Sequence, residues 1–237
     1  MKSKFLPLFF VACLSPVLSA DTISWVGTST GDWTTPTNWS NSAAPAAGNT
    51  YAVSGTGKLA ISPSTGSVTF AGDALSISSA AKLRLYTVNG GTNINDTFTI
   101  PNLSLDGATI SPASSLGSVT QILANQALLS NAVVVELNET SSNSNVLTFN
   151  SGFIGSGTLA IQRSGTTGNS RSVNIAGTNS TAAYSGNVTA SGNSSSKTTS
   201  VTISTGTGWG SGTLSIGQWF HRDPLRRNHR HGGYHGW

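Results

Sequence analysis

The chain has 237 residues and a formal net charge of +4, and only 8% of its residues are charged. A typical soluble domain has about 25% charged residues, so Ser, Thr, Asn and Gly must keep this chain in solution. Most of the basic excess lies at the two ends, because residues 21–220 hold six basic and seven acidic residues. A body without a basic excess excludes nucleic-acid binding as a primary function.

Residues 1–20 are typical of a secretory signal peptide. Two lysines precede the apolar run 5–14, and small residues end at Ala20, where cleavage is expected. The run is too short to cross a bilayer stably, so we expect a secreted or cell-surface protein with no transmembrane helix in the mature chain. A buried strand and a lipoprotein leader processed at Cys13 are the alternatives. Cleavage after Ala20 removes Cys13, the one cysteine, which excludes disulfides and thiol chemistry in the mature chain.

Residues 21–51 form a distinct opening segment that contains Trp25, Trp33, Trp39 and Tyr51. One interpretation is that these rings cap the end of a repetitive fold or pack its first coil, because terminal repeats are expected to be atypical. The other is a platform on which sugar rings stack, since flat aromatic side chains bury much area at little entropic cost.

Short strands are predicted along the rest of the chain. Residues 67–70, 82–86 and 97–100 alternate apolar and polar side chains, as half-buried strands do. Residues 119–129 fit either a short helix or two strand fragments, and we favour strands because the neighbouring segments are strands. Residues 133–137 give the strongest strand prediction, and we expect that strand to be buried.

The clearest repetition lies in residues 138–217. The phrase Gly-Ser-Gly-Thr-Leu occurs at 155–159 and again at 210–214. Strand-like segments begin roughly 10 to 15 residues apart, which suggests about two strands in each coil of a solenoid with a 20-to-30-residue repeat.

These phrases carry a family resemblance. Residues 153–216 resemble the autotransporter-associated β-strand repeat of large exported bacterial surface proteins, through the two Gly-Ser-Gly-Thr-Leu phrases and the Tyr-Ser-Gly at 184–186. The opening, with Trp-Val-Gly, Gly-Asp-Trp and Asn-Trp-Ser, resembles the start of such proteins. The resemblance implies a right-handed parallel β-helix passenger exported to the cell surface. Many such proteins run longer and end in an outer-membrane barrel, for which no strand pattern remains after residue 217.

The sequence shows no catalytic constellation. Every histidine lies after residue 220, so a Ser-His-Asp triad has no histidine in the body. Asp96 and Asp106 could align on adjacent coils, but the other acidic residues of the repeat region are widely spaced; they are Asp73, Glu136 and Glu139. Turn positions explain these acids better than catalysis does, so we expect no enzyme activity, no cofactor and no metal site.

The tail, residues 218–237, differs from everything before it, with four histidines and four arginines and no serine or threonine. It fits a shifted reading frame, an electrostatic attachment segment, or a metal-binding tail through His229, His231 and His235. We expect it to be disordered or frameshifted.

Together these features predict an all-β chain: a signal peptide (1–20), an N-terminal cap or first coil (21–51), solenoid repeats (52–217), incomplete at the C-terminal end, and the tail (218–237). The expected function is that of an exported structural or adhesive surface protein, with surface glycans or other cell-surface proteins as partners. The alternatives are a carbohydrate-binding module built on Trp25, Trp33, Trp39 and Tyr51, and a β-helix enzyme that degrades polysaccharides.

Overall fold

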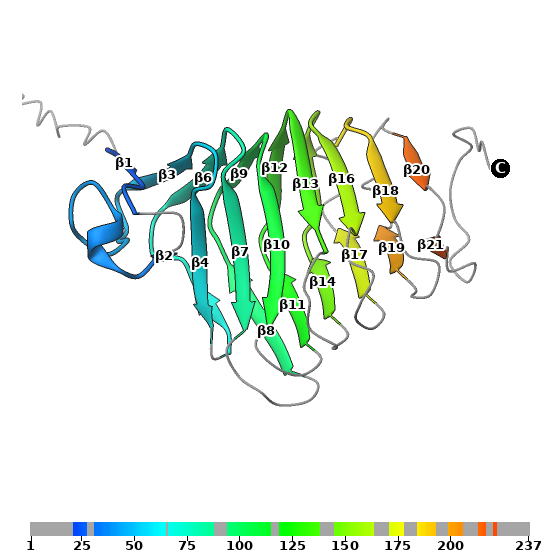
Figure 1. The fold of residues 1–237 in the computed structure, drawn as a ribbon, viewed down its shortest axis with the longest axis horizontal. Coiled ribbons are helices and arrows are strands. Elements are labelled where there is room, and N and C mark those ends of the chain that lie inside the picture. Colours follow the sequence, from blue (N-terminus) through cyan, green and yellow to red (C-terminus); the bar gives the residue numbers. More distant parts are fainter. Residues whose placement is uncertain are drawn as a thin grey trace, which may run out of the picture.

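The structure is a computed structural model that describes residues 21–27, 31–64, 66–87, 94–114, 119–137, 145–163, 171–177, 184–192, 199–205, 213–216 and 220–221. Within these residues the chain forms short strands stacked coil upon coil, as Figure 1 shows. One short 3-10 helix, η1 (Pro36–Asn38), interrupts them near the N-terminal end. The prediction of an all-β solenoid is confirmed.

The described strands form three parallel sheets. From β3 to β17 the chain enters the first, second and third sheet in turn, and the later described strands alternate between the second and third sheets. The first sheet has the order β1 (Thr22–Ser24), β3 (Thr50–Ser54), β6 (Ala74–Ser78), β9 (Leu103–Asp106), β12 (Ala127–Ser130) and β15 (Phe153–Gly155). The second has the order β2 (Gly31–Asp32), β4 (Leu59–Ser64), β7 (Lys82–Thr87), β10 (Thr109–Ser114), β13 (Ala132–Glu136), β16 (Thr158–Arg163), β18 (Val188–Gly192) and β20 (Leu214–Ile216). The third has the order β5 (Val68–Thr69), β8 (Ile94–Thr99), β11 (Val119–Leu123), β14 (Asn145–Phe149), β17 (Arg171–Gly177), β19 (Thr199–Thr205) and β21 (Phe220–His221).

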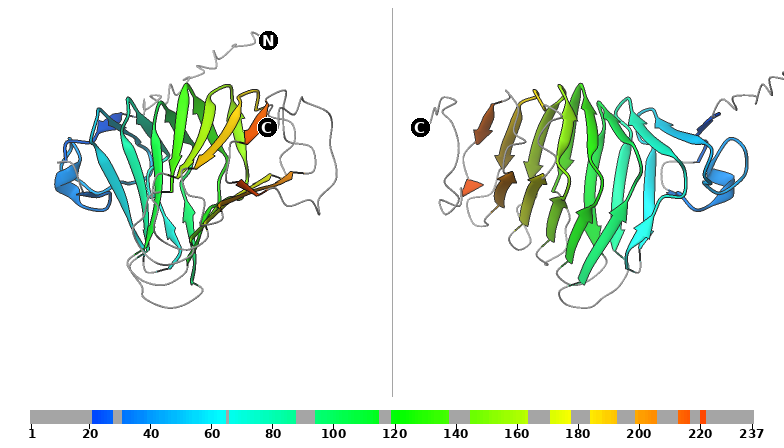
Figure 2. Two further views of the ribbon diagram at one scale, coloured as in Figure 1. Left: turned by 45° about the vertical axis from the view of Figure 1, so that its right-hand side comes forward. Right: turned by 180° about the vertical axis from the view of Figure 1, so that it is seen from behind.

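Each strand inside a sheet pairs with the strand one coil before it and the strand one coil after it, and the first and last described strands of a sheet have one such partner. Strand residues that are partners on neighbouring coils are 21 to 30 residues apart, with the extremes at Thr199–Phe220 and Val68–Phe98. This spacing agrees with the predicted 20-to-30-residue repeat. From β3 to β17 each coil contains three strands rather than the two expected from the sequence, because a third sheet closes the cross-section. From β18 on, the described coils contain two strands each, as the sequence predicts for the end of the repeat region. The two views of Figure 2 show the sheets facing one another around a common interior.

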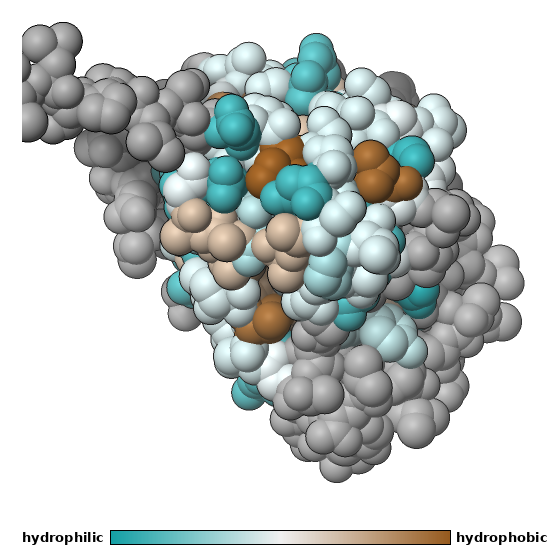
Figure 3. All heavy atoms as spheres, turned by 90° about the vertical axis from the view of Figure 1, so that its left-hand side faces the viewer, coloured by the Kyte–Doolittle hydropathy of each residue, from teal (hydrophilic) through white to brown (hydrophobic). Residues whose placement is uncertain are grey.

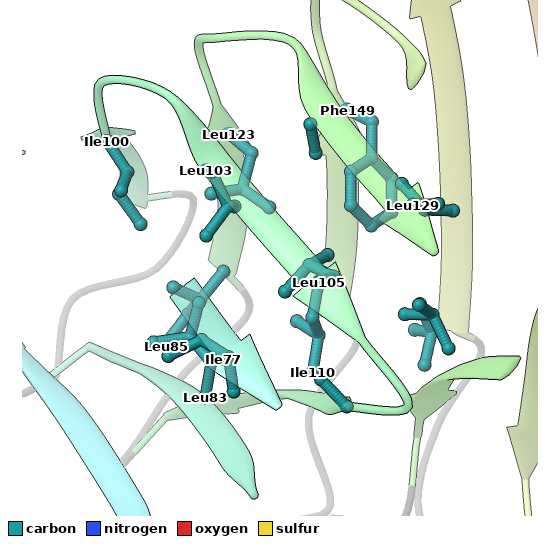
Figure 4. Close-up of a cluster of buried hydrophobic side chains, with 14 of the residues drawn as sticks. Ile77, Leu83, Leu85, Ile100, Leu103, Leu105, Ile110, Leu123, Leu129 and Phe149 are labelled. Atoms are coloured by element: carbon teal, nitrogen blue, oxygen red, sulfur yellow. The ribbon is translucent and has the colours of Figure 1, made fainter. Parts of the chain in front are cut away.

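Columns of apolar side chains fill that interior. In the first sheet Tyr51, Leu75 and Leu103 occupy matching positions on successive coils and are at most 2% exposed. In the third sheet Leu123 and Phe149 are partners in the same way. Figure 4 shows side chains of all three sheets converging in the middle of the stack. Alternation along each strand therefore sets which residues fill the core.

The predictions for residues 119–129 and for residues 133–137 have different outcomes in the structure. Residues 119–129 form parts of β11 and β12, so the preference for strands is confirmed. Residues 133–137 do form most of β13, but β13 alternates: Val133 and Val135 face the interior, and Val134 lies between them on the outer side. The continuous apolar run therefore does not indicate burial on both faces.

Asn and Gly residues turn the chain at the corners. Asn102 and Asn131 have φ angles of 45° and 53°, in the left-handed region that Asn tolerates better than most residues.

No helix among the described residues is long and apolar enough to cross a membrane. The leader, and all of the tail except Phe220 and His221 in β21, lie outside the described residues.

Candidate functional site

The four aromatic residues singled out in the sequence lie together at the N-terminal end of the stack. Trp39 is central: its ring centroid is 5.1 Å from that of Trp25 and 4.9 Å from that of Tyr51, both edge to face. Trp33 reaches the cluster through Phe70, at 5.4 Å. Such edge-to-face pairs are worth about 0.5–1.5 kcal/mol each beyond the area they bury.

Polar atoms of the same side chains tie the cluster to the backbone. Trp39 Nε1 donates a hydrogen bond of 2.7 Å to the carbonyl oxygen of Trp33. The hydroxyl oxygen of Tyr51 accepts a hydrogen bond of 2.9 Å from the backbone N–H of Ala46. These bonds hold the segment between β2 and β3 over the first coil.

Burial decides what the cluster can do. The exposed fraction is 6% for Trp25 and 1% each for Trp33, Trp39 and Tyr51. A sugar ring stacks on an aromatic face that water can reach, and these faces are covered by other rings. The geometry therefore favours the packing interpretation over the stacking platform.

The outer faces of the sheets are rich in hydroxyl groups. On the third sheet, Thr97, Thr148 and Thr202 point outward between inward-facing neighbours. On the first sheet, Ser76 and Ser104 are partners on successive coils. Neighbouring coils link these groups, since the Oγ atoms of Ser172 and Ser200 lie 2.7 Å apart and Asn174 Nδ2 donates to Thr148 Oγ1 at 3.3 Å. Polar groups recur along these columns, but apolar residues interrupt them, since Ile122 lies between Thr97 and Thr148 and Leu128 follows Ser104.

Charged side chains gather on the outer face of the second sheet. Lys82 on β7 forms an ion pair with Glu136 on β13, two coils away, with β10 between them. The guanidinium of Arg84 lies 4.9 Å from the ring centroid of Tyr86 on the same strand. Both interactions lie on a partly exposed surface, where ion pairs contribute at most about 1 kcal/mol.

A group of polar residues inside the solenoid was not predicted from the sequence. Its members are at most 3% exposed, and they are Asp96, Gln121, Asn145, Arg163, Arg171 and Thr199. Gln121 Nε2 donates to the backbone oxygens of Leu85 and Ala113 at 2.9 and 2.8 Å. Arg163 Nη1 donates to Thr199 Oγ1 at 3.1 Å, and burial lowers the pKa of Arg163. Strand alternation could have predicted the inward position of these polar residues, because each of them lies an even number of residues from an inward-facing apolar residue of the same strand.

The candidate acids do not converge. Asp96 on β8 faces the interior, whereas Asp106 lies at the end of β9 and accepts a hydrogen bond from Asn131, so the two do not align on adjacent coils. Asp73 Oδ1 accepts a hydrogen bond of 3.0 Å from the N–H of Gly48, as a turn residue does. Glu139, His229, His231 and His235 lie outside the described residues. Within the described ranges, no group of three or more His, Cys, Asp or Glu residues could hold a metal ion.

Comparison of the chain with protein-family models, with curated proteins and with solved structures finds no match. The resemblance of residues 153–216 to the autotransporter-associated repeat therefore stays a prediction from the sequence.

Proposed function

We propose that this protein is exported and serves at the cell surface as a structural or adhesive rod. The observation that carries the proposal is the division of side chains in the solenoid: apolar columns fill the interior, and hydroxyl ladders cover much of the outside. The predicted signal peptide and the resemblance to exported surface proteins support the location.

The proposed mechanism is mechanical. Parallel backbone pairing joins each coil to the next, so the rod is held by many similar hydrogen bonds and not by a single core contact. The outer columns present hydrogen-bond donors and acceptors at several coils along the stack. A glycan or a surface protein with repeating polar groups would contact several coils at once. Each hydrogen bond then adds only about 0.5–1.5 kcal/mol, but linked contacts raise the overall affinity strongly.

Two measurements test the proposal. The first is surface accessibility of the tagged full chain to protease on intact cells that express it; protection of the tag throughout contradicts the proposed location. The second is retention of the full chain on immobilised polysaccharides and on cell envelopes, where an absence of retention on all of them contradicts the adhesive role.

Matched variants assign the binding face. The triple variant Thr97→Val, Thr148→Val and Thr202→Val removes outer hydroxyls of the third sheet and keeps the β-branched shape. The double variant Ser76→Ala and Ser104→Ala removes outer hydroxyls of the first sheet and keeps the rest of each side chain. We expect one of the two variants to lose retention while both keep the β-rich circular dichroism spectrum. Unchanged retention in both would show that these ladders do not bind the ligand.

A further inference from the structure

We propose that residues 33–49, here called the edge guard, keep the N-terminal edge of the solenoid from pairing with the last coil of a second copy of this chain. This role does not depend on the proposed adhesive function. It follows from how the segment pairs with β1, the outermost described strand of the first sheet.

One edge of β1 is used by the solenoid and the other by the edge guard. On the inner edge, the N–H of Trp25 donates to Ala52 of β3 at 2.8 Å. On the outer edge, the N–H of Ser40 donates to the oxygen of Ser24 at 2.9 Å, and Val26 donates to Asn38 at 2.8 Å. The N–H of Ser24 also donates to Ser40 Oγ at 3.1 Å. The outer edge of β1 is thereby occupied at these positions.

The direction of this pairing differs from that of the solenoid. The bridge between Trp25 and Trp39 is antiparallel, whereas all the recorded pairings between named strands are parallel. The helix η1 lies directly before Trp39 in the edge guard and interrupts its extended backbone. The edge guard therefore does not offer a further coil a parallel strand edge to pair with. Exposed strand edges are templates for pairing with another chain, and covering an edge with a loop is one way in which proteins protect it.

The edge guard also closes the neighbouring edge and is anchored firmly. Asn38 Nδ2 donates to the backbone oxygen of Asp32 in β2, the outermost described strand of the second sheet, at 2.8 Å. A Cβ atom at Gly31 would lie 2.7 Å from Asn38 Nδ2 and 2.9 Å from Trp25 Cζ2, so a larger residue there would displace one of these side chains. The Trp39 ring, 1% exposed, fixes the segment to the first coil.

Without the edge guard, the outer edge of the first coil would be exposed, and a second copy of this chain is the partner that fits it. The parallel register continues as far as β20 in the second sheet and β21 in the third, so β20 of one copy has the direction needed to pair with β2 of another, whereas β15 is the last described strand of the first sheet. The strand β1, Thr-Ile-Ser, has neither the charges nor the proline that often protect an edge. Contact between the first coil of one copy and the last coil of another is head to tail and does not close, so it would lead to filaments. Figure 3, which views this end, shows mostly pale and teal described surface with small separate brown patches, as expected for a closed end.

The first test is the full chain with Ser40→Pro, which removes both the N–H that binds Ser24 and the Oγ that accepts from it. We expect association at a protein concentration about tenfold lower than for the unaltered chain, measured by light scattering coupled to size exclusion. Ser40→Ala keeps the backbone N–H and should stay close to the unaltered chain. Leu105→Ala weakens the core without touching the edge and should not associate.

A reversible lock supplies the second test, should Ser40→Pro lose its fold. Ser24 and Ser40 face each other as a hydrogen-bonded antiparallel pair, for which the Cα separation of about 5.5 Å suits a disulfide. In a Cys13→Ser background, Ser24→Cys with Ser40→Cys should block association in mild urea when oxidised and permit it after reduction. The proposal is overturned if folded Ser40→Pro stays monomeric, if Leu105→Ala associates equally, or if the oxidised lock associates like the unaltered chain.

Discussion

Replacing Trp39 with alanine distinguishes packing from sugar binding in the aromatic cluster. Trp39 is 1% exposed and contacts Trp25, Tyr51 and Phe70 with ring centroids 5.1, 4.9 and 6.4 Å away. Its Nε1 also donates to the oxygen of Trp33. The substitution therefore removes a buried ring and a buried hydrogen bond together.

The expected loss is large. Replacing a buried Phe or Trp by Ala costs about 3–5 kcal/mol, a range that already contains the lost ring contacts. A buried carbonyl left without its partner adds about 1–3 kcal/mol. The total is comparable with the free energy of unfolding of a typical domain, about 5–15 kcal/mol. In a solenoid each coil depends mainly on its neighbours, so we expect the loss to fall on the first coils.

Hydrogen exchange measured residue by residue is the appropriate assay. In Trp39→Ala, amides of β1 and β3 should lose protection, whereas those of β11 and β14 should keep most of theirs. Trp39→Phe, which retains a ring but loses the Nε1 donor, should show a smaller loss at the same amides. If Trp39→Ala leaves exchange unchanged but abolishes retention on polysaccharides, the packing interpretation is wrong and the rings form a binding surface.

Three further predictions concern the coils. Burial raises the pKa of Tyr184 to about 12. Because the folded pKa is above the usual value, the contribution of the neutral Tyr184 phenol to stability is complete below about pH 10 and should be lost as the pH rises toward 12. Urea unfolding of Tyr184→Phe should lack this alkaline loss of stability. A Cβ at Gly186 would lie 1.9 Å from the oxygen of Gly157, so overpacking in Gly186→Ala should lower the free energy of unfolding by about 1–3 kcal/mol or more. The melting temperature should fall with it, and an unchanged melting temperature would contradict the close approach. Gln121→Leu leaves two backbone oxygens of the second sheet without this donor and should cost about 1–3 kcal/mol in urea unfolding, whereas a gain in stability would show that the amide is not needed there.

Much of the fold was predictable because strand alternation is a local property. Leu83 and Leu85 alternate with polar neighbours, and both are fully buried in β7. The same rule places Arg171 inward, in step with Val173 and Ile175, yet charge argues for the surface and the position was not predicted. Alternation was the better guide at that strand, since a strand in a fixed register turns every second side chain inward whatever its chemistry.

The candidate site was less accessible from the sequence. The density of aromatic residues in 21–51 is visible and favours a packed cap, but the same pattern also fits an exposed platform for sugar rings. The choice depends on Phe70, which comes from the next coil and packs against Trp33 and Tyr51. No local pattern records that contact.

The amino-acid sequence by itself determined the strands, the repeat length and the division between an apolar interior and a hydroxyl-rich exterior, because these depend on side-chain period and turn residues over a few positions. Only the tertiary structure decided that a coil has three sides, that the tryptophans are covered, and that residues 38–40 run antiparallel along β1. Those outcomes depend on which segments meet, from Trp25 and Trp39, 14 residues apart, to Trp33 and Phe70, 37 residues apart. Closure of the coil sets those contacts, and no residue does so alone.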